Sequence, residues 1–285
     1  MSTQISTAFV NQFSANVTML SQQMGSLLRN TVDTESVTGE KAFFDQIGSA
    51  AAAVRTTRHG DTPLMETPHQ RRMVTLQDFE YADLIDDQDK IRMLSDPTSV
   101  YAKAAAAGIG RAMDDTIITA FNASASTGKA GATSTALPAG NIIAHGSAGL
   151  TVAKLISAKK LLDAGSVDPS INRYIVVSPE QIEDLLNTTS VTSSDFNTVK
   201  ALATGTVDSF VGFKFIVSNR LKDDGTSRQC YAWAEDGMKM AIGKEPSAQI
   251  TQRADKSYAT QVYYCASFGA TRMEEAKVIQ VLCNE

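Results

Sequence analysis

Residues 96–122 read DPTSVYAKAAAAGIGRAMDDTIITAFN, and this stretch decides the fold that we expect. Asp96 is placed to cap the first turn of a helix, and Pro97 suits its first position, where a missing N–H costs nothing. Apolar residues then recur at helical spacing: Val100, Ala104, Ala107, Met113, Ile117 and Phe121. The pattern predicts one alanine-rich helix of roughly 40 Å. Because helices in compact domains average ~11–12 residues, we interpret this one as a structural rod.

The glycines inside this helix do not form a nucleotide-binding motif. Gly108 and Gly110 begin like a dinucleotide fingerprint, but a third glycine is missing and no strand precedes them. We expect them to permit a close contact or a slight bend in the helix.

Composition narrows the class of protein. The chain has 285 residues, with 26 Lys and Arg against 31 Asp and Glu, a formal net charge of −5 that argues against a duplex-DNA binder. Its three cysteines are widely spaced and form no metal-binding pair, which suggests reduced thiols. No apolar run approaches the ~18–20 residues that would cross a bilayer, so we expect no membrane contact.

The N-terminal residues predict an arm with an amphipathic helix over 4–29. Its apolar stripe is Ile5, Phe9, Phe13, Val17, Leu20 and Met24. Two alternatives stay open for the partner of this stripe: another subunit, or the core of the same chain.

Residues 48–72 hold few large apolar side chains, several arginines and the turn sequence GDTP at 60–63. The following residues 73–85 are β-prone. Together these two stretches predict a long two-stranded excursion that cannot bury a core of its own, and such an arm is marginal in water. We therefore expect a neighbouring subunit to brace it.

Four aspartates, Asp83, Asp86, Asp87 and Asp89, precede the long helix. A calcium-binding loop would need a glycine at its sixth position, which neither frame has, so we predict no metal site. The aspartates suit a solvated approach to a helix N-terminus, or they receive the arginine-rich arm of a neighbour.

The rest of the chain mixes helices and strands without a regular βαβ rhythm, which predicts an α+β fold. The expected helices cover residues 151–163, 179–186 and 195–203. The expected strands cover residues 173–177, 207–218, 229–234, 259–268 and 277–283.

No group of residues assembles into a catalytic site or a cofactor site. The three histidines, His59, His69 and His145, lie in loop-like sequence, and no HExxH, GxSxG or Cys–His arrangement occurs. We predict a protein that is not an enzyme and that needs no cofactor.

The order of these features resembles the major capsid proteins of tailed bacteriophages, whose fold is shared with encapsulins and the herpesvirus capsid floor. The likeness rests on the segments 58–63, 69–72, 86–89, 96–101, 111–114 and 210–217. It implies an N-terminal arm at 1–47, an extended β-hairpin loop at 48–85 and a peripheral domain with the spine helix at 86–147. It also implies an axial domain at 148–243 and, at 244–285, strands that return to the peripheral domain.

By that resemblance, copies of the chain form hexamers and pentamers of an icosahedral bacteriophage head that encloses double-stranded DNA without sequence-specific binding. The location implied is the virion, after assembly in the host cytoplasm. A separate scaffolding protein and a portal are expected partners, and a decoration protein is a further one. The inter-subunit contacts that we expect are Arg55, Arg58, His59, His69, Arg71, Arg72, Asp83, Asp86, Asp87 and Asp89, with loop arginines of one copy facing aspartates of the next.

Two alternatives remain: an encapsulin-like compartment shell, and a soluble α+β enzyme or binding domain. One departure from some relatives concerns covalent cross-linking through a lysine of the extended loop. Residues 48–85 contain no lysine, so we expect no such cross-link.

Overall fold

The structure is a computed structural model that describes residues 21–58, 60, 64–85, 98–187 and 209–285. Its contacts group the chain into two units, and each is described by itself. The first unit comprises Met1–Ser26, Asp78–Ala112 and Lys244–Ser267. The second unit comprises Leu27–Gln77, Met113–Gly243 and Phe268–Glu285.

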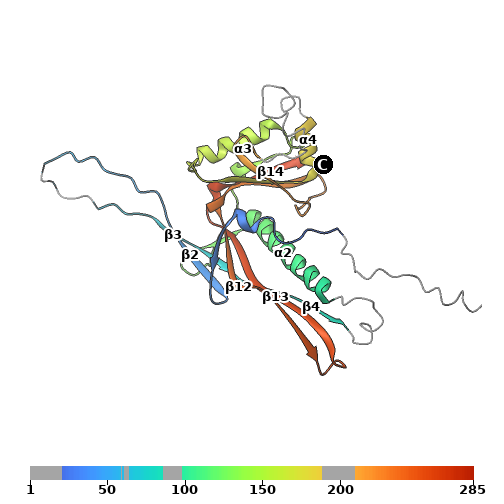
Figure 1. The fold of residues 1–285 in the computed structure, drawn as a ribbon. Helices are drawn as coiled ribbons and strands as arrows, with labels where there is room; N and C mark the ends of the chain where they lie inside the picture. The colour runs from blue at the N-terminus through green and yellow to red at the C-terminus, as the bar shows by residue number, and fades with distance from the viewer. Residues whose placement is uncertain (1–20, 59, 61–63, 86–97, 188–208) are drawn as a thin grey trace, which may run out of the picture. The chain divides into compact units, whose positions relative to one another are not determined.

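The long helix expected from the sequence is present as α2, which covers Thr98–Asn122 (Figure 1). Asp96 and Pro97, its expected cap and first residue, lie outside the described residues. The apolar positions Met113, Ile117 and Phe121 are buried, as their spacing predicted.

The second unit contains a six-stranded sheet in the order β7-β14-β11-β8-β10-β9. Its strands are β7 (Ile142–Ile143), β8 (Arg173–Val177), β9 (Ser209–Phe210), β10 (Phe213–Val217), β11 (Ser227–Ala234) and β14 (Val278–Asn284). Strand β11 is antiparallel to both of its neighbours, β14 and β8. This places the last strand of the chain inside a sheet built mostly from residues 142–234.

Aromatic side chains fill the core beneath this sheet. Phe121, on the last turn of α2, stacks on Tyr231 at a centroid distance of 4.8 Å and meets Trp233 at 4.7 Å. The indole N–H of Trp233 donates to the carbonyl of Thr31 at 2.9 Å, which satisfies the one polar group of a fully buried ring.

Two helices accompany the sheet: α3 (Val152–Ala164) and α4 (Pro179–Asn187). Thr151 caps α3 by accepting a hydrogen bond from the backbone N–H of Lys154, and Gly165 follows the last turn. Both helices confirm their sequence-based predictions to within a residue or two. The helix expected at 195–203 lies outside the described residues.

A second sheet of the second unit has the order β2-β3-β5-β6. Its strands are β2 (Lys41–Ile47), β3 (His69–Thr75), β5 (Ala125–Thr127) and β6 (Thr133–Thr135). Strands β2 and β3 form a long antiparallel pair, from Lys41 opposite Thr75 to Ile47 opposite His69.

A third sheet has the order β1-β12-β13-β4. Its strands are β1 (Asp33–Ser36), β12 (Met238–Arg253), β13 (Ala259–Arg272) and β4 (Gln77–Ile85). Short 3-10 turns complete the described elements: η2 (Arg29–Thr31), η3 (Ala139–Asn141), η4 (Glu235–Gly237) and η5 (Glu275–Lys277).

Three local expectations differ from the structure. The strand expected over 207–218 is divided within its described part, 209–218, because Val211 and Gly212 both have positive φ and turn the chain between β9 and β10. Residues 21–28 are not helical, although we expected a helix to residue 29, and Gly25 adopts a φ of +83° there. The 16-residue strand β12 has no counterpart among our expected strands.

Candidate assembly interface

The pair β2–β3 carries the extended loop. The last rung of this ladder is the hydrogen bond from the N–H of Gly48 to the carbonyl of Pro68, at 2.8 Å. The chain beyond it continues as a long excursion without strand pairing in its described residues, 49–58, 60 and 64–67 (Figure 1). The excursion that we expected over 48–85 therefore begins with a strand, β2, that precedes it.

Apolar side chains along this excursion are open to solvent. Leu64 is 97% exposed, Val54 is 88% exposed and Met65 is also exposed. Single exposed apolar residues are ordinary, but several on one unsupported segment indicate a surface that another chain covers.

The arginines that we predicted as contacts differ in their exposure to solvent. Arg55 and Arg58 are exposed, and Arg55 donates to the backbone carbonyl of Thr57 at 3.0 Å. His69 is exposed at the start of β3, and His59 lies outside the described residues. Arg55, Arg58 and His69 thus have side chains accessible to a partner.

Arg71 pairs across the hairpin with Asp45, which lies directly opposite it in the ladder. Its Nη2 donates to Oδ2 of Asp45 at 3.0 Å, and its Nε donates to Oδ1. The hydrogen bonds from Arg71 hold the pKa of Asp45 below its usual value. The pair is exposed, so Arg71 remains accessible beside the ring of Phe43.

Arg72, the next residue of β3, points to the opposite face of the sheet from Arg71 and is only 3% exposed. Its Nη2 donates to both carboxylate oxygens of Glu275, at 2.8 and 2.7 Å, and its Nε donates to the carbonyl of Met273 at 2.9 Å. Charge-assisted hydrogen bonds to Glu275, together with the bond to Met273, fix the relative position of the two backbones. Arg72 therefore ties the base of the hairpin to its own chain, and it is not accessible to a neighbour in this structure.

A second buried arginine meets the same carboxylate. Arg272 is fully buried and ion-paired with Glu275 at 3.6 Å. It donates to the carbonyls of Phe121 at 2.8 Å, Ala123 at 3.0 Å and Thr135 at 2.9 Å. Burial lowers the pKa of Arg272, and Glu275 opposes that shift. The guanidinium caps the C-terminal end of α2, where free carbonyls favour a cation.

Of the four aspartates that precede the long helix, the structure describes only Asp83. Its carboxylate accepts from the hydroxyl of Tyr81 at 3.3 Å and from the backbone N–H of Leu84 at 2.9 Å. Asp86, Asp87 and Asp89 lie outside the described residues. The pairing of this patch with a neighbour's loop stays a prediction.

The root of the N-terminal arm is bound to α2. In the first unit, Arg111 donates to the side chain of Gln22 at 2.8 Å and to the carbonyl of Gln23 at 3.1 Å. A Cβ added to Gly110 would lie 2.4 Å from the backbone of Gly25, so this glycine permits the close contact that we expected. Sequence inspection did not identify Gly25 as its partner.

In the second unit, Asp114 holds the next residues of the arm. Its two carboxylate oxygens accept from the backbone N–H groups of Leu27 and Leu28, at 3.1 Å each. Met24 is exposed, and the other stripe residues, Ile5, Phe9, Phe13, Val17 and Leu20, lie outside the described residues. The packing of the stripe therefore stays a prediction.

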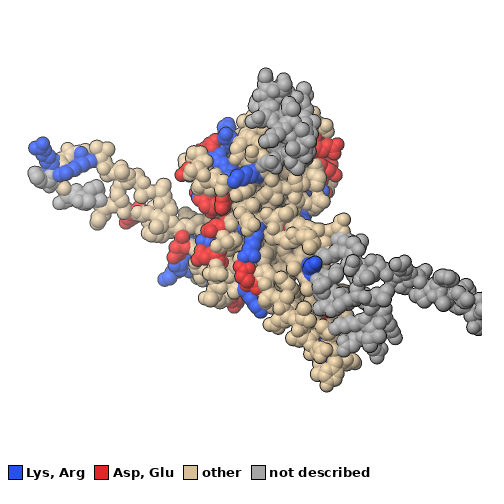
Figure 2. Space-filling view, viewed as in Figure 1, with Lys and Arg blue, Asp and Glu red and all other residues tan. Residues whose placement is uncertain are grey.

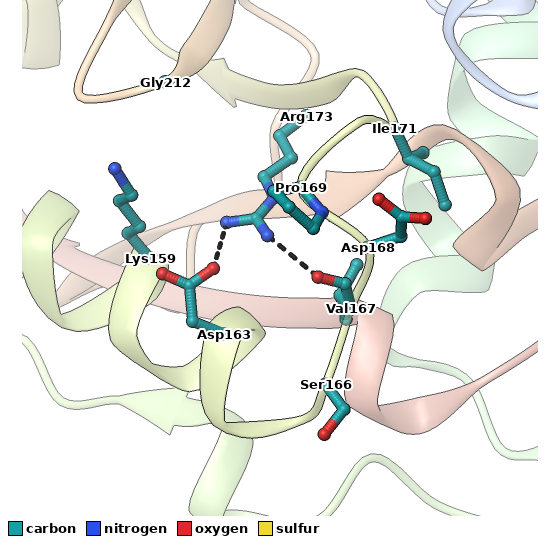
Figure 3. Close-up of a pocket in the computed structure, with 9 residues that line it drawn as sticks. All are labelled: Lys159, Asp163, Ser166, Val167, Asp168, Pro169, Ile171, Arg173 and Gly212. Atoms are coloured by element: carbon teal, nitrogen blue, oxygen red, sulfur yellow. Dashed lines mark hydrogen bonds and ion pairs between the residues drawn. The ribbon is translucent and has the colours of Figure 1, made fainter. Parts of the chain in front are cut away.

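The described residues show a cavity of about 650 Å³ at the end of α3 (Figure 3). Arg173 lies in its wall and is held by Asp163 at 2.7 Å and by the carbonyl of Val167 at 3.2 Å. Within the described ranges, no cluster of His, Cys, Asp or Glu has the geometry of a metal site, and no helix is both long and apolar enough to cross a membrane.

Comparisons with known proteins place the chain in a family. The phage capsid protein family matches residues 5–285. Among curated proteins, none matches the chain.

Several solved capsids have a similar structure. The capsid of cyanophage P-SCSP1u matches with a TM-score of 0.78 at 15% identity, over 100% of this chain and 96% of that one. Mycobacterium phage Che8 matches at 0.70 and 16% identity, over 96% and 97% of the two chains. The capsid of a native GTA particle matches at 0.73 and 14% identity, over 98% and 96%.

These identities show a shared fold, and the family match extends over nearly the whole chain. Neither favours the encapsulin-like shell or the soluble enzyme that we kept as alternatives. The chain belongs to the phage capsid protein family and is a major capsid protein, a structural subunit that assembles into the shell of a virion.

Proposed function

We propose that this chain forms hexamers and pentamers that close an icosahedral head around double-stranded DNA, and that the extended loop joins each subunit to the next. The observation that carries the proposal is the exposure of Leu64, Val54 and Met65 on a segment without strand pairing beyond Gly48 and Pro68. Burying such side chains contributes roughly 25 cal/mol per Å² of apolar area. A neighbouring copy would supply the cover that this chain's described residues lack.

The proposed surface includes fewer charged residues of the loop than we expected from the sequence. Arg55, Arg58, His69 and Arg71 are accessible, so they remain candidates to face the acidic approach of a neighbour. We leave Arg72 out of the proposed surface, because it binds Glu275 of its own chain. Since exposed ion pairs contribute only ~0–1 kcal/mol each, the proposal depends on their repetition around a closed shell.

The domain assignments belong to the same proposal. Residues 1–47 would be the arm and 48–85 the loop, and the spine helix would belong to a peripheral domain at 86–147. Residues 148–243 would form the axial domain, and residues 244–285 would supply the strands that return to the peripheral domain. A separate scaffolding protein and portal, a decoration protein and assembly in the host cytoplasm are further expected features. The net charge of −5 suits a lumen that repels the phosphates of DNA.

The test uses the full chain with Leu64→Asp and Val54→Asp together. We expect this variant to fold and stay soluble, because both side chains project from the loop, but to lose ring and shell formation in sedimentation and electron microscopy. The matched control is Val217→Asp, at an exposed apolar residue outside the loop. Wild-type yields of particles from the loop variant would overturn the proposed role of the loop.

A further inference from the structure

The outward face of α3 combines an apolar side chain with unpaired positive charge. Ile156 is 55% exposed, and Lys159 and Lys160 follow it on the solvent side of the helix. Neither lysine has an ion-pair partner among the described residues, whereas Asp163 on the same helix is paired with Arg173. An exposed apolar residue flanked by unpaired charges resembles the centre and rim of a protein–protein contact.

The cavity at the end of α3 extends this face (Figure 3). Lys159 stands at one side of it, beside Gly212 of the β9–β10 turn. Arg173 is 93% buried by its surroundings, being only 7% exposed, and its Nε has no acceptor within the described structure. The lining carries side chains of both charges, because Asp163 and Asp168 lie in it beside Lys159 and Arg173, so the cavity adds a hollow to this face and the two lysines supply its positive charge.

Helix α4 presents the opposite charge. Glu180 and Glu183 are one turn apart and both are exposed, while Gln181 and Leu185 face the interior and are buried. Neither glutamate forms an ion pair with a described residue. Helix α3 therefore exposes Lys159 and Lys160, and helix α4 exposes Glu180 and Glu183. Figure 2 shows side chains of both charges in the region of α3, whose place is labelled in Figure 1.

We propose that the α3 face of one copy, with its cavity, binds the acidic face of α4 of the next copy. The two faces are different surfaces of one unit, so the contact is head-to-tail, which is the arrangement that generates a closed ring. Ile156 supplies the apolar centre, and the paired charges set orientation and exclude the wrong faces more than they add affinity. The inference rests on the self-assembly described above and names the surfaces that it uses.

The test reverses each face in turn in the full chain. The first variant is Lys159→Glu with Lys160→Glu, and the second is Glu180→Lys with Glu183→Lys. Each brings like charges together at every contact, so we expect the fraction of chains in rings or shells to fall about tenfold or more. All four substitutions in one chain restore opposite charges, and this variant should assemble like the wild type.

Mixing the two reversed variants gives a sharper outcome. In an alternating ring, each α3 face again meets an α4 face of opposite charge. Alternation closes only in rings with an even number of copies. The mixture should therefore recover six-membered rings but not five-membered ones, as counted by electron microscopy.

Controls separate the possible failures. Lys222→Glu changes one exposed lysine in the same unit, away from α3, and should assemble normally, whereas Lys160→Glu should not. Circular dichroism and melting temperature establish that each variant is folded. Normal assembly of folded, reversed variants, or no recovery in the fourfold variant, overturns this inference alone. A folded wild-type chain that never forms rings or shells overturns the proposed function as well.

Discussion

Arg272 donates a hydrogen bond from Nη1 to the carbonyl oxygen of Phe121, at 2.8 Å, on the last turn of the spine helix α2. The two residues are 151 positions apart in the sequence, and both are buried. The contact satisfies a carbonyl that the helix itself leaves without a partner. It joins the end of the longest helix to the last residues of β13.

Replacement of Arg272 should therefore destabilise the fold. Arg272→Met removes a buried cation and frees three carbonyls, so we expect the free energy of unfolding to drop by about 3–5 kcal/mol. Urea denaturation followed by circular dichroism measures this change. The control is Arg253→Met, because the Arg253–Asp255 pair is exposed and should contribute little. Equal effects of the two substitutions would contradict a structural role for Arg272.

Removal of the negative charge of Glu275 should lower the free energy of unfolding as much as replacement of Arg272. Glu275→Gln leaves Arg72 and Arg272 as two buried cations without their anion, and we expect a loss of about 3–5 kcal/mol in the free energy of unfolding. A loss of solubility or of fold at 37 °C would accompany it. Stability within about 1 kcal/mol of the wild type would show that the arginines are satisfied by backbone carbonyls alone.

The free energy of unfolding should depend on pH through the carboxyl group of Glu285. Burial works to raise the pKa of this carboxyl, but hydrogen bonds from Arg228, Ser178 and Gln181 outweigh it and hold the pKa below its usual value. Because the folded-state pKa is depressed, the stabilisation is present above the unfolded value of about 4.3 and is lost as pH falls through the folded value.

The measurement compares the wild type with Glu285→Gln by thermal unfolding from pH 6 downward. The wild type should be more stable at pH 6, and the difference should shrink as the carboxylate takes up a proton. Glu66→Gln, at an exposed residue of the loop, is the control and should show no such convergence. Parallel curves for the wild type and Glu285→Gln at every pH would exclude this linkage.

The glycines of α2 should differ in their tolerance of a methyl group. A Cβ at Gly110 would meet the backbone of Gly25 at 2.4 Å, whereas a Cβ at Gly108 meets only the side chain of Arg111 at 3.7 Å. Gly110→Ala should release the arm root and make residues 21–26 sensitive to protease. Gly108→Ala should keep them protected and stabilise the helix by roughly 0.5–1 kcal/mol. The same cleavage pattern in both variants would be evidence against the contact.

The sequence predicted α2, α3 and α4 well, because their signals are local. Thr151 and Pro179 mark helix starts, and the apolar spacing in α2 survives a run of alanines. Strand β12 was missed because Gly243, Lys244 and Pro246 interrupt any strand pattern. Pairing with strands on both sides outweighs those propensities.

The charged residues of the candidate interface were harder to place. Arg71 and Arg72 are neighbours in one arginine-rich segment, yet alternate residues of a strand face opposite ways. Arg71 is therefore exposed beside Asp45, and Arg72 is buried on Glu275, which lies 203 residues further along the chain. No local pattern reveals a partner at that distance. The sequence also did not predict a contact between the α3 and α4 faces, because which surfaces of two copies can meet depends on where the fold places each helix.

The shared carboxylate of Glu275 also determines how the molecule would respond to tension. A pull on the extended loop reaches β3, then Arg72, then Glu275, and through Arg272 the end of α2. Each contact on this route is direct, so a force on the loop of an assembled subunit would pass into α2 without an intervening flexible linker. A shell built from such subunits would stretch where subunits meet before any single subunit gave way.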